Sequence, residues 1–463
     1  MATTSIERSR SASGGLRDLL TSCSPGAVVL AAAIPFLFLH ERYHPSFTID
    51  AVGSGVEVRL SDVAVLAVLV AAALEARAGV GRLRAGKALW IAGAALLAWL
   101  AFQVVRPASL DDPGFDDHLV SYLKLVEYSL LALAVPLLVR RSRDLTLVLG
   151  VAVVWGAAAT SVALAQFFGL DVLDAWNPGW RQPSFLGHHD LAALAALGLA
   201  LALTGILAGR SSIPASRVFW LALGAGGLGM ILAGSVAAAG GLALGALALW
   251  LAARARFRPS GRQALALALT VAVVGAGVLS VRDADVGNYL RFLGIRGDDQ
   301  AQGVESYSQR TVLAYIGLRI AKDNPLVGVG WQRSSTPEVF LPYVPGARER
   351  FPDVVELAFP AEGREWGVQN LYIQMLADAG AIGLVLLLAV GFAGVLLAWR
   401  AAARAPTAWA TGAGLVTVCA LLTVGSEWAS LGIVAGIPLQ AATCLLLGLA
   451  AAGAASASEA EVG

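Results

Sequence analysis

The chain has 463 residues, of which 57% are hydrophobic and only 14% are charged, and its mean hydropathy is +0.71. A soluble domain has about 25% charged residues, so this composition cannot cover a water-exposed surface with polar groups. Lipid must therefore be the solvent for much of the chain. The net charge of +1 argues against nucleic acid as a partner, because nucleic-acid-binding surfaces are strongly basic.

Apolar runs of the length of a membrane-spanning helix recur along the chain and predict an all-α integral membrane protein of about twelve spans. A polar, basic segment (1–25) precedes the first run, which lacks a small-residue cleavage site, so we expect a retained span. Nine spans are expected in 26–281 and three in 371–452, before a short tail at 453–463. The runs are 26–40, 62–76, 88–105, 119–139, 145–169, 190–209, 217–235, 237–253, 263–281, 371–399, 407–428 and 430–452.

The charges of the connecting turns predict their side of the membrane. The even-numbered turns are rich in Arg and Lys, whereas the third turn, residues 106–117, has one arginine and four aspartates. By the positive-inside rule the basic turns are cytoplasmic, which makes both termini cytoplasmic as well. The basic residues are Arg77, Arg82, Arg84, Lys87, Arg140, Arg141, Arg143, Arg210, Arg217, Arg254, Arg256, Arg258, Arg262, Arg400 and Arg404.

One connection, residues 282–370, is long and charged and is expected outside the membrane with short helices of its own. Connections of this length are usually functional. Gln309–Lys322 is predicted to be an amphipathic helix that ends before Pro325, because proline disfavours helix in the residue before it. Gly328 and Gly330 should then form a turn. The apolar positions of this helix are Val312, Leu313, Ile316 and Ile320.

Three stretches follow one another along the chain: WRQPSFLGHHDLA at 180–192, Arg310 to Trp331 with DNPLVGVG at 323–330, and QNLYIQMLADAGAIG at 369–383. Their order resembles the O-antigen ligase/polymerase family of bacterial membrane glycosyltransferases. The first resembles the family's outer-loop arginine and helix start. The second resembles its arginine-containing helix with a "PLxGxG" exit, and the third its "HNxYLQxLxExGxxG" motif. The span count and the single large loop also fit.

The resemblance implies transfer of a glycan from a polyprenyl-diphosphate carrier to an acceptor hydroxyl, on the outer face of the bacterial plasma (inner) membrane. The acceptor would be a glycan, a lipid or a protein, and neither a metal nor another cofactor is implied. Loop arginines would hold the diphosphate, and a histidine would assist the acceptor. A diphosphate leaving group needs positive donors directed at its developing charge, and the arginine fork suits phosphate oxygens.

Two positions depart from the family pattern. Gln369 stands where the family has histidine, and a glutamine side chain cannot take up a proton near neutral pH. Val236 stands where the family often has arginine, in the sequence Ser235-Val236-Ala237. Either other side chains supply this chemistry, or the chain does not transfer glycans.

The resemblance assigns candidate catalytic roles to Gln369, Asn370 and Asp378. It assigns candidate diphosphate-binding roles to Arg310, Arg181 and Arg319. Each arginine has an alternative interpretation as a solvated or interfacial side chain. His188 and His189 are possible substitutes for the missing base, because imidazole titrates near neutral pH, although they also fit an ordinary helix start. Glu427, near the outer end of the eleventh run, could face the same cavity as these candidate residues.

Two further functions stay open. A transporter would require an internal repeat and broken helices near the membrane midplane, and no clear repeat is visible. A non-catalytic binder of lipid-linked glycan would keep Arg310 but lack the base.

Gly241 and Gly245 have the GxxxG spacing that is typical of helix packing in membranes.

Overall fold

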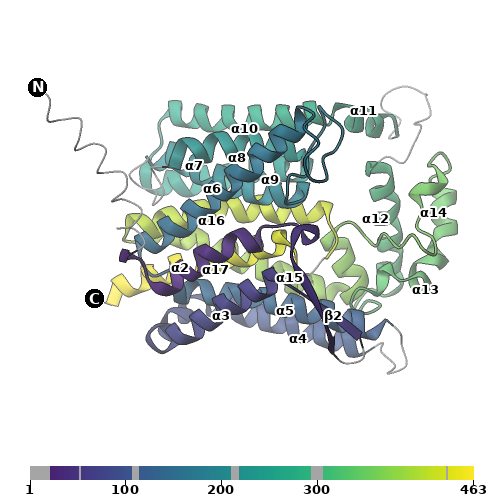
Figure 1. The fold of residues 1–463 in the computed structure, drawn as a ribbon, viewed down its shortest axis with the longest axis horizontal. Helices are drawn as coiled ribbons and strands as arrows, with labels where there is room; N and C mark the ends of the chain where they lie inside the picture. The colour runs from purple at the N-terminus through teal and green to yellow at the C-terminus, as the bar shows by residue number, and fades with distance from the viewer. Residues whose placement is uncertain are drawn as a thin grey trace, which may run out of the picture.

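A computed structural model describes residues 21–51, 54–106, 114–209, 218–292, 306–433 and 436–462. Most of them form helices that run along one bundle (Figure 1). The helices are α2 (Pro25–Leu37), α3 (Leu60–Gly79), α4 (Lys87–Val105), α5 (Phe115–Leu138), α6 (Ser142–Phe167), α7 (His188–Ala208), α8 (Phe219–Ala233), α9 (Val236–Phe257), α10 (Gly261–Val281), α15 (Leu371–Arg404), α16 (Ala408–Glu427) and α17 (Pro438–Val462).

Within these described ranges, nine helices are long and apolar enough to cross a membrane, as expected of a multi-pass membrane protein. α2 and α8 are apolar but shorter. Each of the twelve predicted runs overlaps a described helix, whereas the count of twelve spans stays a prediction.

The helices form two groups with α16 and α17 between them (Figure 1). α7 is almost entirely buried and packs against α6, α8, α9 and α16. Gly241 and Gly245 of α9 lie directly against Thr423 and Cys419 of α16, with no room for a Cβ atom. The GxxxG spacing therefore serves helix packing, as predicted, because small residues let two backbones approach closely.

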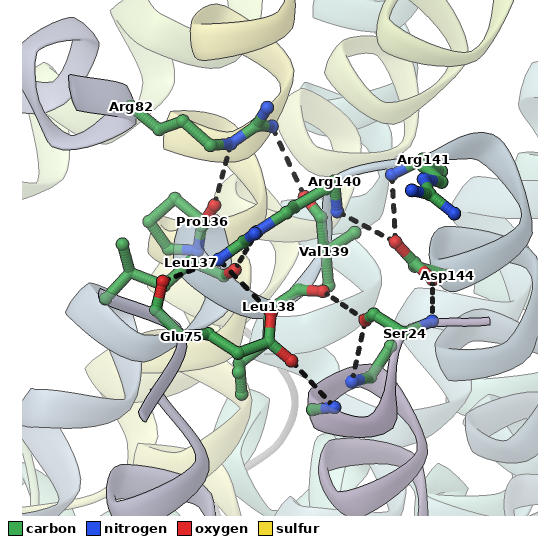
Figure 2. Close-up of polar contacts among 12 residues, drawn as sticks. Ser24, Glu75, Arg82, Pro136, Leu137, Leu138, Val139, Arg140, Arg141 and Asp144 are labelled. Carbon is green, nitrogen blue, oxygen red and sulfur yellow. Dashed lines mark hydrogen bonds and ion pairs between the residues drawn. The ribbon is translucent and has the colours of Figure 1, made fainter. Parts of the chain in front are cut away.

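The C-terminal end of α5 illustrates how buried backbone groups are satisfied (Figure 2). The last carbonyls of a helix have no partner within the helix and need donors from elsewhere. Arg82 Nε donates to Pro136 O at 2.9 Å, Arg140 Nε to Leu137 O at 2.6 Å, and the Ser24 hydroxyl to Leu138 O at 3.1 Å.

Asp144 fixes the start of α6 in the same region. Its fully buried carboxylate accepts backbone N–H groups of Ser24, at 2.9 Å, and of Arg140 and Arg141, each at 3.0 Å (Figure 2). Arg140 also forms an ion pair with Glu75 at 3.1 Å. Arg140 thus joins the end of α5 to α3, and Asp144 joins the starts of α2 and α6 to this turn.

A β-hairpin between α2 and α3 was not predicted. β1 (Ser46–Ala51) pairs antiparallel with β2 (Ser54–Arg59). Arg59 at its end forms ion pairs with Glu41 at 2.9 Å and Glu57 at 3.0 Å. The local signal for this hairpin is the alternation of apolar and polar residues on either side of a glycine-containing segment.

The long connection forms a helical cap at the end of the bundle (Figure 1). It contains α11 (Asp283–Phe292), α12 (Ser306–Asp323), α13 (Pro337–Phe340) and α14 (Val344–Arg350). α12 confirms the predicted amphipathic helix and ends before Pro325. Its buried Val312, Ile316 and Ile320 pack against Phe340, Val344 and Phe359.

Two of the sequence motifs bind one another through their backbones. α15 is bent at Gly380, where φ is +67° and the conformation is not helical. Val329 N donates to Ala377 O at 3.0 Å, Gly330 N to Asp378 O at 2.8 Å, and Ala381 N to Pro325 O at 2.8 Å. A Cβ atom on Gly380 would collide with Leu326 O, and one on Gly328 would collide with the Asp378 carbonyl. Both contacts therefore require glycine.

Candidate functional site

A cavity of about 470 Å³ lies where the cap meets the ends of α9 and α10. Three of its lining residues are arginines from distant parts of the sequence. Arg181 precedes α7, Arg282 follows α10, and Arg310 belongs to α12. None of the described residues that line the cavity is acidic, so we name it the cationic cavity.

Arg282 is the most deeply buried of the three, with 3% of its surface exposed. It forms an ion pair with Asp285 at 2.6 Å, and its guanidinium lies 5.1 Å from the centre of the Tyr307 ring. Its Nη2 atom is buried and has no hydrogen-bond partner among the described residues. The one carboxylate of Asp285 leaves this guanidinium with a donor that the described residues do not satisfy, at the wall of a cavity that two further arginines line.

The turn between α8 and α9 brings Arg181 and Arg282 together. Gly234 in this turn has a left-handed conformation, with φ at +61°, and a Cβ atom there would lie 2.7 Å from Cβ of Arg181. Arg282 Nη1 donates to the Gly234 carbonyl at 3.5 Å. Arg282 and Val236 line the same cavity, and Val236 is the position where the family that the sequence resembles often has arginine. Sequence reasoning missed Arg282 because an arginine at the end of an apolar run is usually interfacial.

Burial and, after it, the neighbouring positive charges lower the pKa values of two of these arginines. Burial, together with the charges of Arg282 and Arg310, lowers the pKa of Arg181 to about 10. Burial, followed by the charge of Arg282, also lowers the pKa of Arg310. A bound anion would reduce this repulsion, and the three guanidiniums offer several donors for it.

Arg310 forms one wall of the cavity through two contacts. Its Nε donates to Gln369 Oε1 at 3.1 Å, and its Nη2 lies 3.4 Å from His189 Nε2. The next residue, Asn370, caps α15 by accepting the N–H groups of Tyr372 and Ile373, each at 3.1 Å. Its amide also donates to Ala429 O at 2.8 Å, which ties the start of α15 to the end of α16.

His189 is joined to a buried carboxylate. Its Nδ1 is in hydrogen-bond contact with Glu427 Oε1, and the Ser235 hydroxyl donates to Glu427 Oε2. Glu427 is completely buried, so it lies behind the cavity wall and supports a residue that lines it. The ring of the neighbouring His188 makes tilted contacts with the rings of His189 and Trp176, whose centres lie 3.9 and 5.1 Å away.

A second cavity, of about 810 Å³, lies on the other side of Arg310. Four residues line both cavities and form the junction between them: His188, His189, Arg310 and Gln369. We name the larger one the mixed-charge cavity, because its lining carries both acidic and basic side chains beside Trp366. These charged residues are Glu41, Glu57, Arg59, Asp117, Lys124 and Glu365.

The remaining candidates line neither cavity. Asp378 is buried and accepts Ser334 N–H at 2.8 Å and Gln374 Nε2 at 3.2 Å, which anchors the loop after α12. Arg319 is exposed on α12.

Two observations bear on cofactors and relatives. Within the part of the chain that the structure describes, no group of three His, Cys, Asp or Glu side chains is placed to hold a metal ion. A comparison of the sequence with models of known protein families found no match, and neither did a search of the curated proteins.

Proposed function

We propose that this chain transfers a glycan from a polyprenyl-diphosphate carrier to an acceptor hydroxyl, as its resemblance to the O-antigen ligase/polymerase family implies. The observation that carries the proposal is the cationic cavity in a bundle of apolar helices. Arg181, Arg282 and Arg310 converge on it, and none of the described residues that line it is acidic. A diphosphate joined to a membrane lipid matches both properties.

The pair of cavities matches a reaction between two substrates. The donor diphosphate would bind in the cationic cavity, and the acceptor would enter the mixed-charge cavity. Their common wall contains Arg310, His189 and Gln369, so the reacting atoms would meet there. Trp366 offers an aromatic face against which a sugar ring can stack.

The position of the site along the bundle favours a transferase over a transporter. Ser235 is the N-cap of α9, Arg282 is the C-cap of α10, and Gln369 lies just before α15. The site is therefore at helix ends, whereas a transporter holds its substrate near the membrane midplane. We place this end of the bundle outside the plasma membrane, where lipid-linked glycans would be used.

The test is the amount of polyprenyl-diphosphate-linked glycan in cells that lack the protein. The glycan should accumulate in these cells and return to its normal level when the wild-type protein is restored. Arg310→Ala should leave the accumulation in place, because the cavity loses a guanidinium and the contact to Gln369.

Arg319→Ala is the matched control, since it removes an exposed arginine from the same helix and should relieve the accumulation as the wild type does. The amount of each variant in the membrane must be equal. Unchanged glycan in cells lacking the protein would reject the transferase. A variant with Arg310→Ala that relieves the accumulation would remove this arginine from the site.

A further inference from the structure

Three buried side chains, Ser235, Glu427 and His189, are joined by hydrogen bonds beside the junction of the two cavities. Position 369 holds glutamine where the family that the sequence resembles has histidine, so another residue would have to act as the base. We infer that His189 is the base that accepts the proton of the acceptor hydroxyl, and that Glu427 and Ser235 hold it in position. This inference rests on the proposed transfer reaction. It assigns the proton transfer to one residue of the site and supporting roles to two others.

The hydrogen bonds fix where the protons lie. The Ser235 hydroxyl oxygen accepts Ala238 N–H at 3.2 Å as the cap of α9, and its hydrogen points to Glu427 Oε2. An ionised Glu427 carboxylate only accepts, and with it the hydrogen between Glu427 and His189 belongs to Nδ1. Arg310 can only donate, so the facing Nε2 of His189 carries a lone pair. His189 is thereby held as the tautomer whose free lone pair points into the junction.

The surroundings of the ring also fix its orientation. α7, α9 and α16 each contribute one of the three joined side chains, and all three are buried, Glu427 completely. The Ser430 hydroxyl lies 3.4 Å from His189 Nδ1 and donates to Glu427 O at 2.9 Å, which closes the remaining side. A base held by a carboxylate through its far nitrogen keeps its geometry while the near nitrogen reacts.

The comparison with His188 assigns the role to one of the two adjacent histidines. His188 lines both cavities as His189 does, but its Nε2 is buried with no hydrogen-bond partner among the described residues. Among the described residues no carboxylate is bonded to its ring, which makes a tilted contact with the Trp176 ring. Only His189 has both an orienting partner and a nitrogen facing Arg310.

The step balances without any further reactant. The acceptor oxygen forms a bond to the anomeric carbon of the glycan while its proton passes to Nε2 of His189. The bond from that carbon to the diphosphate oxygen breaks, and its electron pair leaves with the polyprenyl diphosphate. Arg181, Arg282 and Arg310 stabilise the charge on this leaving group, and the proton on His189 then passes to water.

Arg310 connects the two halves of this step. Its guanidinium faces both Gln369 and His189 Nε2, at 3.1 and 3.4 Å. A diphosphate in the cationic cavity would compete for the same guanidinium, because phosphate is the stronger acceptor. Binding of the donor would therefore draw Arg310 away from His189 and leave the Nε2 lone pair open to the acceptor.

The test uses membranes that contain donor and acceptor, with the wild-type protein or a variant restored to cells that lack it. His189→Ala should lower the turnover of lipid-linked glycan by about 100- to 10,000-fold, the usual range for loss of a general base. Binding of polyprenyl diphosphate by the purified variant should stay within about threefold of wild type, because the three arginines remain. Glu427→Gln should show the same pattern with a smaller loss of turnover.

Two rescues separate a base from a residue that only packs. Added imidazole should restore part of the turnover of His189→Ala, and the second substitution Gln369→His should do so as well. Position 369 flanks the same Arg310 guanidinium, so a histidine there would reach the junction. His40→Ala is the control, because His40 lines neither cavity and its loss should leave turnover intact.

The outcomes distinguish the inference from the function on which it rests. If wild-type membranes consume no lipid-linked glycan, the transferase itself is rejected. If they do and His189→Ala is equally active, the base lies elsewhere and the inference is overturned. Loss of polyprenyl diphosphate binding in His189→Ala, with no rescue by imidazole or by Gln369→His, would also overturn it, since His189 would then only shape the cavity.

Discussion

At the scale of single residues, Arg282 gives the cationic cavity a third arginine although position 236 holds valine. It reaches the Gly234 turn from the end of α10, and its Nη2 is directed at no described partner. Val236 lines the same cavity from the first position of α9. A positive charge therefore reaches the cationic cavity from the end of α10, whereas the family that the sequence resembles often has an arginine at the position of Val236, at the start of α9.

Replacement of Arg282 tests whether this residue supplies the positive charge that position 236 lacks. Arg282→Ala should weaken the binding of polyprenyl diphosphate about 10- to 100-fold, because a hydrogen bond to a charged group contributes roughly 1.5–3 kcal/mol. The double variant Arg282→Ala/Val236→Arg should recover part of this loss. The dissociation constant of the purified protein in detergent is the measurement. An unchanged constant in Arg282→Ala would mean that the diphosphate binds elsewhere.

The sequence named some of these residues and could not name others. Arg310 and His189 lie in recognisable motifs, whereas Arg282 is one charged residue after an apolar run and has no local signal. Glu427 was expected beside the cavity, but its contact with His189 joins residues 238 positions apart. Such a contact depends on how α7 and α16 pack, and hydrophobic periodicity does not specify that packing.

At the scale of elements, α12 and the loop after it could be predicted because their signals are local. Apolar residues at helical spacing, the proline after α12 and two glycines are all visible in the sequence. The hairpin of β1 and β2 and the bend of α15 were missed. The bend lies inside a continuous apolar run, where Gly380 looks like any small residue of a membrane helix.

The bend at Gly380 should be essential for the arrangement of the site, because it admits the loop that follows α12. Gly380→Ala places a Cβ atom against Leu326 O at a positive φ, so it should lower stability by at least about 2 kcal/mol. Thermal unfolding followed by tryptophan fluorescence in detergent would measure the loss. Turnover of lipid-linked glycan should fall with it, since this loop fixes α12 and with it Arg310.

Gly391→Ala is the matched control for the bend. It lies further along α15 in a helical conformation, and no atom lies within 4 Å of a Cβ placed there. Alanine favours helix over glycine, so this variant should be as stable as wild type or slightly more stable. Equal stability of Gly380→Ala and wild type would show that α15 does not need the bend.

At the scale of the whole molecule, the basic turn after α5 and the two cavities lie at opposite ends of the bundle. The cap lies at one end of the bundle and the C-terminal end of α17 at the other (Figure 1). Residues of the cap line both cavities, and Asp117 at the start of α5 lines the mixed-charge cavity. The basic turn of Arg140 and Arg141 follows the other end of α5, away from the cavities. By the positive-inside rule we expect the basic end in the cytoplasm. The cavities would then lie outside, on the side that the proposed reaction requires.

Cysteine labelling in intact cells tests this orientation. The background should carry Cys23→Ser, because Cys419 and Cys444 are buried and Cys23 is partly exposed. Glu365→Cys, at the mixed-charge cavity, should react with a membrane-impermeant maleimide added to intact cells, since Glu365 is exposed. Arg143→Cys, exposed at the start of α6, should react only after permeabilisation. The reverse pattern would place both cavities in the cytoplasm, where arginines could still bind a diphosphate but not for transfer on the outer face.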